Sequence, residues 1–192
     1  MKHNLWLWAA AGLAMSFLGA CALTSKTYPG PGGITYRRDK NLHKVWLAQG
    51  FNFTGYDTIY VADTGAMVAP FREESQAFDF AKRLVRDEFA AAIQEKHLFQ
   101  NVVTRESDIK RGAKVLKLET QITQFRKGND TGVSPIIAVY GRMLDNARPV
   151  FQFESRRTGD TAGSRPLGFE VRAMAKSLAE FVGRRAAQGS RP

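Results

Sequence analysis

The stretch from Lys114 to Phe125, KVLKLETQITQF, decides the fold class of this chain. Its side chains alternate between an apolar or β-branched set and a polar set. The first set comprises Leu116, Leu118, Thr120 and Ile122, and the second comprises Lys117, Glu119, Gln121 and Thr123. Successive side chains of a strand point to opposite faces of a sheet, so one face should meet a core and the other water. The pattern predicts a long strand with one open face.

Strand-like segments flank this stretch on both sides. Residues 135–144 and 150–155 are rich in β-branched and aromatic side chains, and the turn-forming segment Asp145–Pro149 separates them. We therefore expect a β-hairpin there. Nearer the N-terminus, Thr58–Ala62 has the composition of a core strand and Leu98–Val103 that of a short strand.

Two segments repeat apolar residues at helical spacing. They run from Glu73 to about Lys96 and from Phe169 to about Ala187. Apolar positions at i, i+3, i+4 and i+7 form the stripe of an amphipathic helix that packs against a core. We expect an α+β domain: a mostly antiparallel sheet of about five strands with two amphipathic helices on one face.

Length and composition limit the structural classes of protein to which the chain can belong. It has 192 residues, of which 44% are hydrophobic and 24% charged, and a single cysteine. These values fit one globular domain and exclude a disulfide framework, a collagen-like repeat and a wholly disordered chain. The 28 Lys and Arg against 18 Asp and Glu give a formal charge of +10, which favours anionic partners.

The N-terminal 20 residues are typical of a signal peptide. Lys2 gives a basic start, and 14 uncharged residues follow from Leu5 to Leu18. A helix of that length rises about 21 Å, which is less than the ~30 Å of a bilayer core, so a membrane span fits less well. We expect cleavage between Ala20 and Cys21.

The end of this segment, Leu18-Gly19-Ala20-Cys21, resembles the bacterial lipobox. The resemblance implies that Cys21 carries a diacylglycerol and an N-acyl chain, and no other cofactor is expected. Two or more acyl chains hold a protein stably on a bilayer. The following Ala22, in place of Asp, implies the outer membrane and its periplasmic side. The alternative is an incidental cysteine after an ordinary signal peptide.

The mature chain divides into a tether, a domain and a tail. Residues 21–44 include the segment Pro29–Gly33, PGPGG, which disfavours helix and strand and predicts a flexible tether. The segment Val45–Leu47 is either a short strand or the end of the tether. We expect the α+β domain to span residues 45–187 and a tail to span 188–192.

Four segments together resemble a bacterial lipoprotein family of unknown function. They are Ile59–Ala62, Phe80–Leu84, Phe99–Val103 and Leu118–Asn129. The resemblance covers roughly residues 45–185, and it implies an architecture similar to the amino-terminal domain of TolB. It implies no catalytic residues.

An Asp-Thr-Gly triplet occurs twice, at Asp63 and at Asp130. This resembles the aspartic peptidases, in which two such loops bring together carboxylates that share one proton. However, those enzymes are all-β, whereas a long helix is expected after Asp63. The simpler interpretation is that each aspartate caps a turn.

The remaining residues do not predict a metal centre, and the basic residues have two interpretations. His43 and His97, the two histidines after the signal peptide, lack the spacing of a metal site. Lys117, Arg126 and Arg156 could form an anion-binding patch if the sheet gathers them on its open face; otherwise they belong to a solvated surface.

Two classes of function therefore stay open. The favoured one is a membrane-anchored lipoprotein that acts as a non-enzymatic interaction or accessory module of the cell envelope. Its expected partner is an envelope protein or an anionic glycan, and no nucleic acid is expected. The alternative is a membrane-tethered, aspartic-type hydrolase that uses Asp63 and Asp130.

Overall fold

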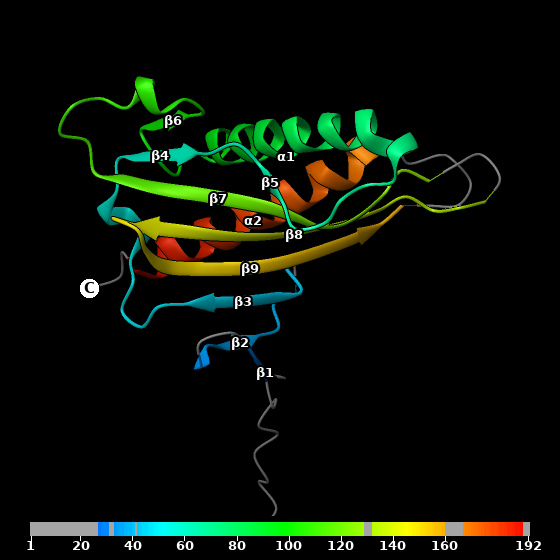
Figure 1. Ribbon diagram of the computed structural model, residues 1–192. Helices are drawn as coiled ribbons and strands as arrows, with labels where there is room; N and C mark the ends of the chain where they lie inside the picture. Colours follow the sequence, from blue (N-terminus) through cyan, green and yellow to red (C-terminus); the bar gives the residue numbers. More distant parts are fainter. Residues whose placement is uncertain (1–26, 31–32, 41, 129–131, 160–166, 190–192) are drawn as a thin grey trace, which may run out of the picture.

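The structure is a computed structural model that describes residues 27–30, 33–40, 42–128, 132–159 and 167–189 (Figure 1). Its nine strands form one sheet in the order β1-β2-β3-β9-β8-β7-β4-β6, and β5 pairs with β7 beside β4. The strands are β1 (Thr27–Pro29), β2 (Thr35–Arg37), β3 (Lys44–Leu47), β4 (Thr58–Val61), β5 (Gly65–Ala66), β6 (Asn101–Val103), β7 (Val115–Arg126), β8 (Ile136–Asp145) and β9 (Arg148–Thr158).

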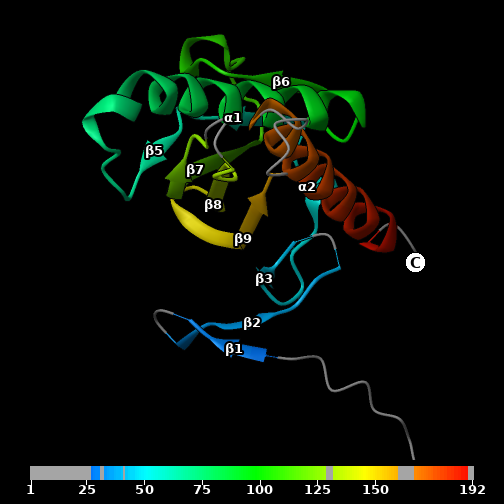
Figure 2. The same ribbon diagram turned by 90° about the vertical axis from the view of Figure 1, so that its right-hand side faces the viewer.

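Two α-helices complete the fold, α1 (Ser75–Glu95) and α2 (Leu167–Gly189). Their ends lie within two residues of those that the apolar spacing predicted. Both helices lie on the same side of the sheet (Figure 2). Short 3-10 turns occur at η2 (Phe53–Gly55), η3 (Arg72–Glu74) and η4 (Glu106–Asp108).

The prediction of about five strands was wrong, although most of the pairing is antiparallel, as expected. The sheet has nine strands and is mixed, because β4 pairs in parallel with both β6 and β7, and β5 pairs in parallel with β7. The chain leaves β4, passes through α1 and returns as β6 in the same direction, which is the crossover that a parallel pair requires. The strands not counted are β1, β2, β3 and β5, which have two to four residues each and show no alternation in the sequence. Of these, β3 corresponds to Val45–Leu47, which was left open between a short strand and the end of the tether.

Strands β1 and β2 lie within residues 21–44, which the composition assigned to a flexible tether. They form an antiparallel pair in which Tyr28 faces Tyr36, and β2 joins β3 through the pair Arg37 and Val45. Aromatic side chains facing each other across two strands stabilise such a pair. The described part of this segment therefore belongs to the sheet.

The core lies between the helices and the long strands β7, β8 and β9. Four of its largest fully buried side chains are rings, Phe89, Phe151, Phe153 and Phe181. The Phe151 ring lies 5.7 Å from that of Phe153 and 5.1 Å from that of Phe181, with both pairs nearly parallel. Such offset pairs add stability beyond the burial of their area.

Candidate binding face of the sheet

The face of the sheet opposite the helices is called here the open face. In Figure 1 the long strands pass in front of α2, so this face is turned to the viewer. The alternation of β7 places Leu116, Leu118 and Ile122 in the core, each fully buried, and leaves Lys117, Glu119 and Gln121 on the open face. The expected two-sided strand is confirmed.

A charged cluster lies at one end of the open face. Glu119 accepts from Lys117 Nζ at 2.8 Å on one carboxylate oxygen and from Arg142 Nε and Nη2, each at 2.8 Å, on the other. The hydrogen bond from Lys117 lowers the pKa of Glu119, and the bond from Arg142 lowers it further. The cluster holds two cations around one carboxylate, so it keeps a net positive charge.

The cluster borders a hollow of about 500 Å³. Lys117 Nζ lies 5.9 Å from the centre of the Tyr60 ring, within the range of a cation–π contact. The remaining lining residues are Glu106, Ile109, Val115, Leu144, Asn146 and Ala147. An aromatic face beside a charged hydrogen-bonding cluster can orient a polar, anionic group.

The structure does not gather the three predicted basic residues into one patch. Lys117 and Arg126 lie nine residues apart on β7, which is about 30 Å along a strand. Arg126 Nε donates to the Ser134 carbonyl at 3.0 Å. Arg156 lies opposite Ala138, near the Arg126 end of the open face. Arg142 is the cation beside Lys117, and only the β7–β8 register, which includes a bulge, reveals it.

Buried polar side chains lie on the part of the open face formed by β2, β3 and β9. Tyr36 donates to the side-chain oxygen of Gln152, and both residues are 6% exposed. Burial, with the neighbouring Tyr140, raises the pKa of Tyr36 to about 12. Lys44 Nζ pairs with Glu154 at 2.7 Å. These bonds tie β2 and β3 to the centre of the sheet.

Asp63 lies on the surface and pairs with a helix residue. Its side chain is 88% exposed, and Arg86 Nη1 donates to it at 2.8 Å. Asp130, Ala20 and Cys21 lie outside the described residues, so the aspartic pair and the lipidation site stay predictions.

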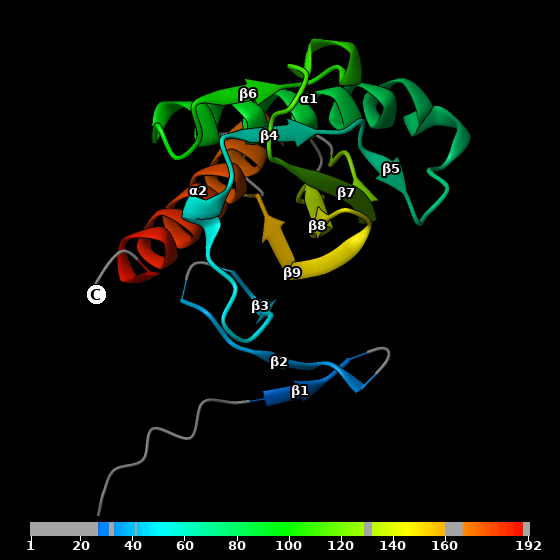
Figure 3. The same ribbon diagram turned by 90° about the vertical axis from the view of Figure 1, so that its left-hand side faces the viewer.

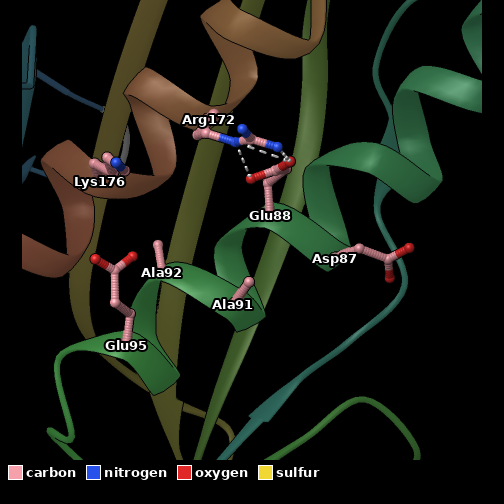
Figure 4. A pocket seen from close by; sticks show the side chains of 7 residues that line it. All are labelled: Asp87, Glu88, Ala91, Ala92, Glu95, Arg172 and Lys176. Carbon is pink, nitrogen blue, oxygen red and sulfur yellow. Dashed lines mark hydrogen bonds and ion pairs between the residues drawn. The ribbon is translucent and has the colours of Figure 1, made fainter.

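A second hollow, of about 440 Å³, lies between the two helices (Figure 4). Arg172 donates from Nε and Nη2 to both oxygens of Glu88, with a shortest distance of 2.8 Å. Its other lining residues are Asp87, Glu95, Lys176, Ala91 and Ala92. The Arg172–Glu88 ion pair joins α2 to α1 beside this hollow.

Within the described part of the chain, no three His, Cys, Asp or Glu side chains gather closely enough to hold a metal ion. No helix in these described ranges is both long enough and apolar enough to span a membrane.

Comparisons with known proteins give a likeness of fold. No protein-family model matches the chain, and no curated protein matches it. Two crystal structures of the PelC dodecamer from Paraburkholderia phytofirmans are similar to it, the first of PelC itself and the second of a point variant. The TM-scores are 0.53 and 0.52, at 13% and 14% identity, over 74% of this chain and 95% of that one. The chain therefore shares the fold of PelC.

Weaker likenesses include two other bacterial proteins. Protein XCC0632 from Xanthomonas campestris, of family DUF330, has a TM-score of 0.41 at 14% identity, over 70% of this chain and 86% of that one. A candidate lipoprotein from Caulobacter crescentus has a TM-score of 0.34 at 15% identity, over 69% and 93% of the two chains.

Proposed function

We propose that this chain is a bacterial lipoprotein, anchored through acylated Cys21 in the outer membrane and facing the periplasm, that acts by binding and not by catalysis. The observation that supports the anchor is the sequence Leu18–Cys21, which ends an uncharged stretch. Its Cys21 lies six residues before Thr27, the first residue of β1. The resemblance to an unassigned lipoprotein family, and to the amino-terminal domain of TolB, implies the same kind of role.

The open face is the proposed binding surface. Lys117, Arg142 and Tyr60 lie together beside a hollow, and the two cations outnumber the one carboxylate, Glu119, that they pair with. Glu106 also lines the hollow, so an anionic group would bind on the Lys117 and Arg142 side of it. An acidic envelope protein or an anionic glycan would exchange water for charge-assisted hydrogen bonds there. Arg126 and Arg156, at the far end of the face, would contact only a partner long enough to span it.

Mass spectrometry of the membrane-fraction protein tests the anchor. We expect an N-terminal peptide that begins at acylated Cys21, and we expect a Cys21→Ser variant to lack it. An uncleaved or unacylated wild-type chain would contradict the proposal.

Site-directed crosslinking tests the binding surface. A photoreactive amino acid at Gln121, on the open face, should capture an envelope partner in cells. The Lys117→Gln, Arg142→Gln double variant should reduce this capture, because it removes both cations of the cluster. A variant with Arg111→Gln and Arg148→Gln, both exposed and equal in charge change, is the control. Equal capture by the two variants would contradict a role for the cluster.

A further inference from the structure

A groove of about 1020 Å³ lies between the N-terminal strands and the end of α2. One wall is formed by β2 and β3, and the other by Phe181, Arg185, Gln188 and Gly189. Figure 3 shows the C-terminal end of α2 on the same flank of the molecule as β3. Its volume lies at the upper end of small-molecule sites, which run to about 1,000 Å³.

The lining of the groove is part polar and part apolar, and its apolar side chains are called here the apolar floor. Val45 and Phe181 are buried at its base, and Ile34, Leu47 and Phe51 are half-buried along it. The Phe51 ring packs edge-on against the buried Phe53 ring, with centroids 5.0 Å apart, so the floor is held by the core. Such a floor suits a hydrocarbon chain.

Two arginines border the apolar floor. Arg37 lies opposite Val45 in the β2–β3 register and so points to the side on which α2 lies. Arg185 lies over the Phe181 ring at 5.5 Å, and its Nη1 donates to Gln188 at 3.2 Å. Among the described residues that line the groove, none is a carboxylate. The neighbouring Arg184 pairs with Asp39, outside the groove lining. The groove therefore combines an apolar floor with two cations, which an anionic amphiphile complements.

The groove also lies close to the expected anchor along the chain. Thr27, the first residue of β1, lines it and follows Cys21 by six residues, a span of about 20 Å at full extension. We infer that the groove binds an anionic phospholipid of the bilayer that holds the anchor. An acyl chain would lie along Val45, Leu47 and Phe181, and the phosphate would lie between Arg37 and Arg185. This inference rests on the proposed function for the position of the membrane.

Photocrosslinking of the mature, lipidated protein in vesicles tests this inference. The vesicles consist of phosphatidylcholine with a fraction of phosphatidylglycerol that carries a photoreactive group on one acyl chain. After irradiation and digestion, mass spectrometry should locate lipid adducts on peptides that contain residues 45–51 and Phe181. A photoreactive phosphatidylcholine, as the only reactive lipid, should give fewer adducts there.

Variants test separately the charge of the two arginines and the space along the apolar floor. The Arg37→Gln, Arg185→Gln double variant should lower groove adducts about tenfold, as expected for the loss of two charge-assisted contacts. Leu47→Trp should lower them by filling the floor while leaving both arginines. The Arg111→Gln, Arg148→Gln variant, with the same change of net charge, should label like the wild type.

Several outcomes would overturn the inference. They are adducts spread evenly over the surface, equal labelling by the two lipids, or unchanged labelling in the double variant. Capture of β3 by a second copy of the chain or by another protein, without lipid adducts, would show that the groove binds protein. The same digest reports the acylated Cys21 peptide separately, so failure of the anchor is distinguished from failure of the groove.

Discussion

The Tyr36 hydroxyl, on β2, donates a hydrogen bond to the Gln152 side chain, on β9, across 116 positions of the chain. Strand β3 lies between these two strands in the sheet. Both partners are buried, so the bond holds the N-terminal hairpin to the body of the domain.

Replacing Tyr36 with Phe should destabilise the protein by about 1–2 kcal/mol, because Gln152 would keep a buried acceptor without its donor. Urea unfolding at equilibrium measures the change. The matched control is Tyr28→Phe on β1, which keeps the ring that Lys44 Nζ approaches at 5.9 Å. Equal stability of the two variants would show that the Tyr36 hydroxyl contributes nothing.

Gly141 allows a ring to lie against the backbone of β8. A Cβ added there would come within 2.2 Å of the Phe153 ring, which is fully buried. Gly141→Ala should therefore cost about 1–3 kcal/mol or more by overpacking. Thermal unfolding of this variant is compared with that of Gly55→Ala, where the added Cβ meets nothing within 4 Å. A Gly141→Ala protein as stable as Gly55→Ala would refute the predicted clash.

His43 should make stability depend on pH. Its Nδ1 accepts from the Arg156 backbone N–H at 3.0 Å, which requires the neutral ring. Burial lowers the pKa of His43 below 6.5, and the charge of Arg157 lowers it further, with smaller contributions from Arg156 and Arg38. Glu154 acts in the opposite direction. The pKa of His43 is thus about 6.5 in the unfolded chain and lower in the folded protein. Between these two values the unfolded chain binds more protons, so the free energy of unfolding should fall as the pH drops below about 6.5.

A His43→Asn variant tests this, because the Asn side chain keeps an acceptor but does not titrate in that range. Unfolding free energies measured on both sides of pH 6.5 should fall less in this variant than in the wild type. An identical fall in both proteins would assign the effect to other groups.

Asp63 should not support hydrolysis. It is exposed and pairs with Arg86, which places a cation at its carboxylate and not a second acid. We expect the purified protein to leave unfolded protein substrates uncleaved at acid pH, and Asp63→Asn, Asp130→Asn to behave the same. Cleavage by the wild type that the double variant abolishes would favour the aspartic hydrolase.

Long-period patterns predicted the central part of the fold. The alternation in β7 placed the core and open faces correctly, and the apolar spacing located α1 and α2. The turn before β9 was also predicted, and its residues Asn146 and Ala147 have positive φ angles of 46° and 70°. Such conformations suit the tight turn of a hairpin.

Contacts between residues that are distant in the sequence determine the parts of the fold and of the site that were not predicted. Strands β1 and β2 have three residues each, and β2 is held by the distant partner Gln152. Likewise, Arg142 meets Glu119 only because β8 pairs with β7 in one register, with an irregularity between Ile122 and Gln124. A one-residue shift would turn every side chain of a strand to the other face. No local pattern in the sequence specifies that register.

The β1–β2 pair also determines how the domain responds to tension. Thr27 faces Arg37, so a pull on the N-terminus acts first on the end of the pair where the chain enters. The hydrogen bonds between β1 and β2 would then break one after another from that end, and not all at once. Releasing residues 27–37 would add up to about 36–40 Å of chain while the long strands stay paired. We therefore expect the hairpin to unfold under tension before the long strands separate.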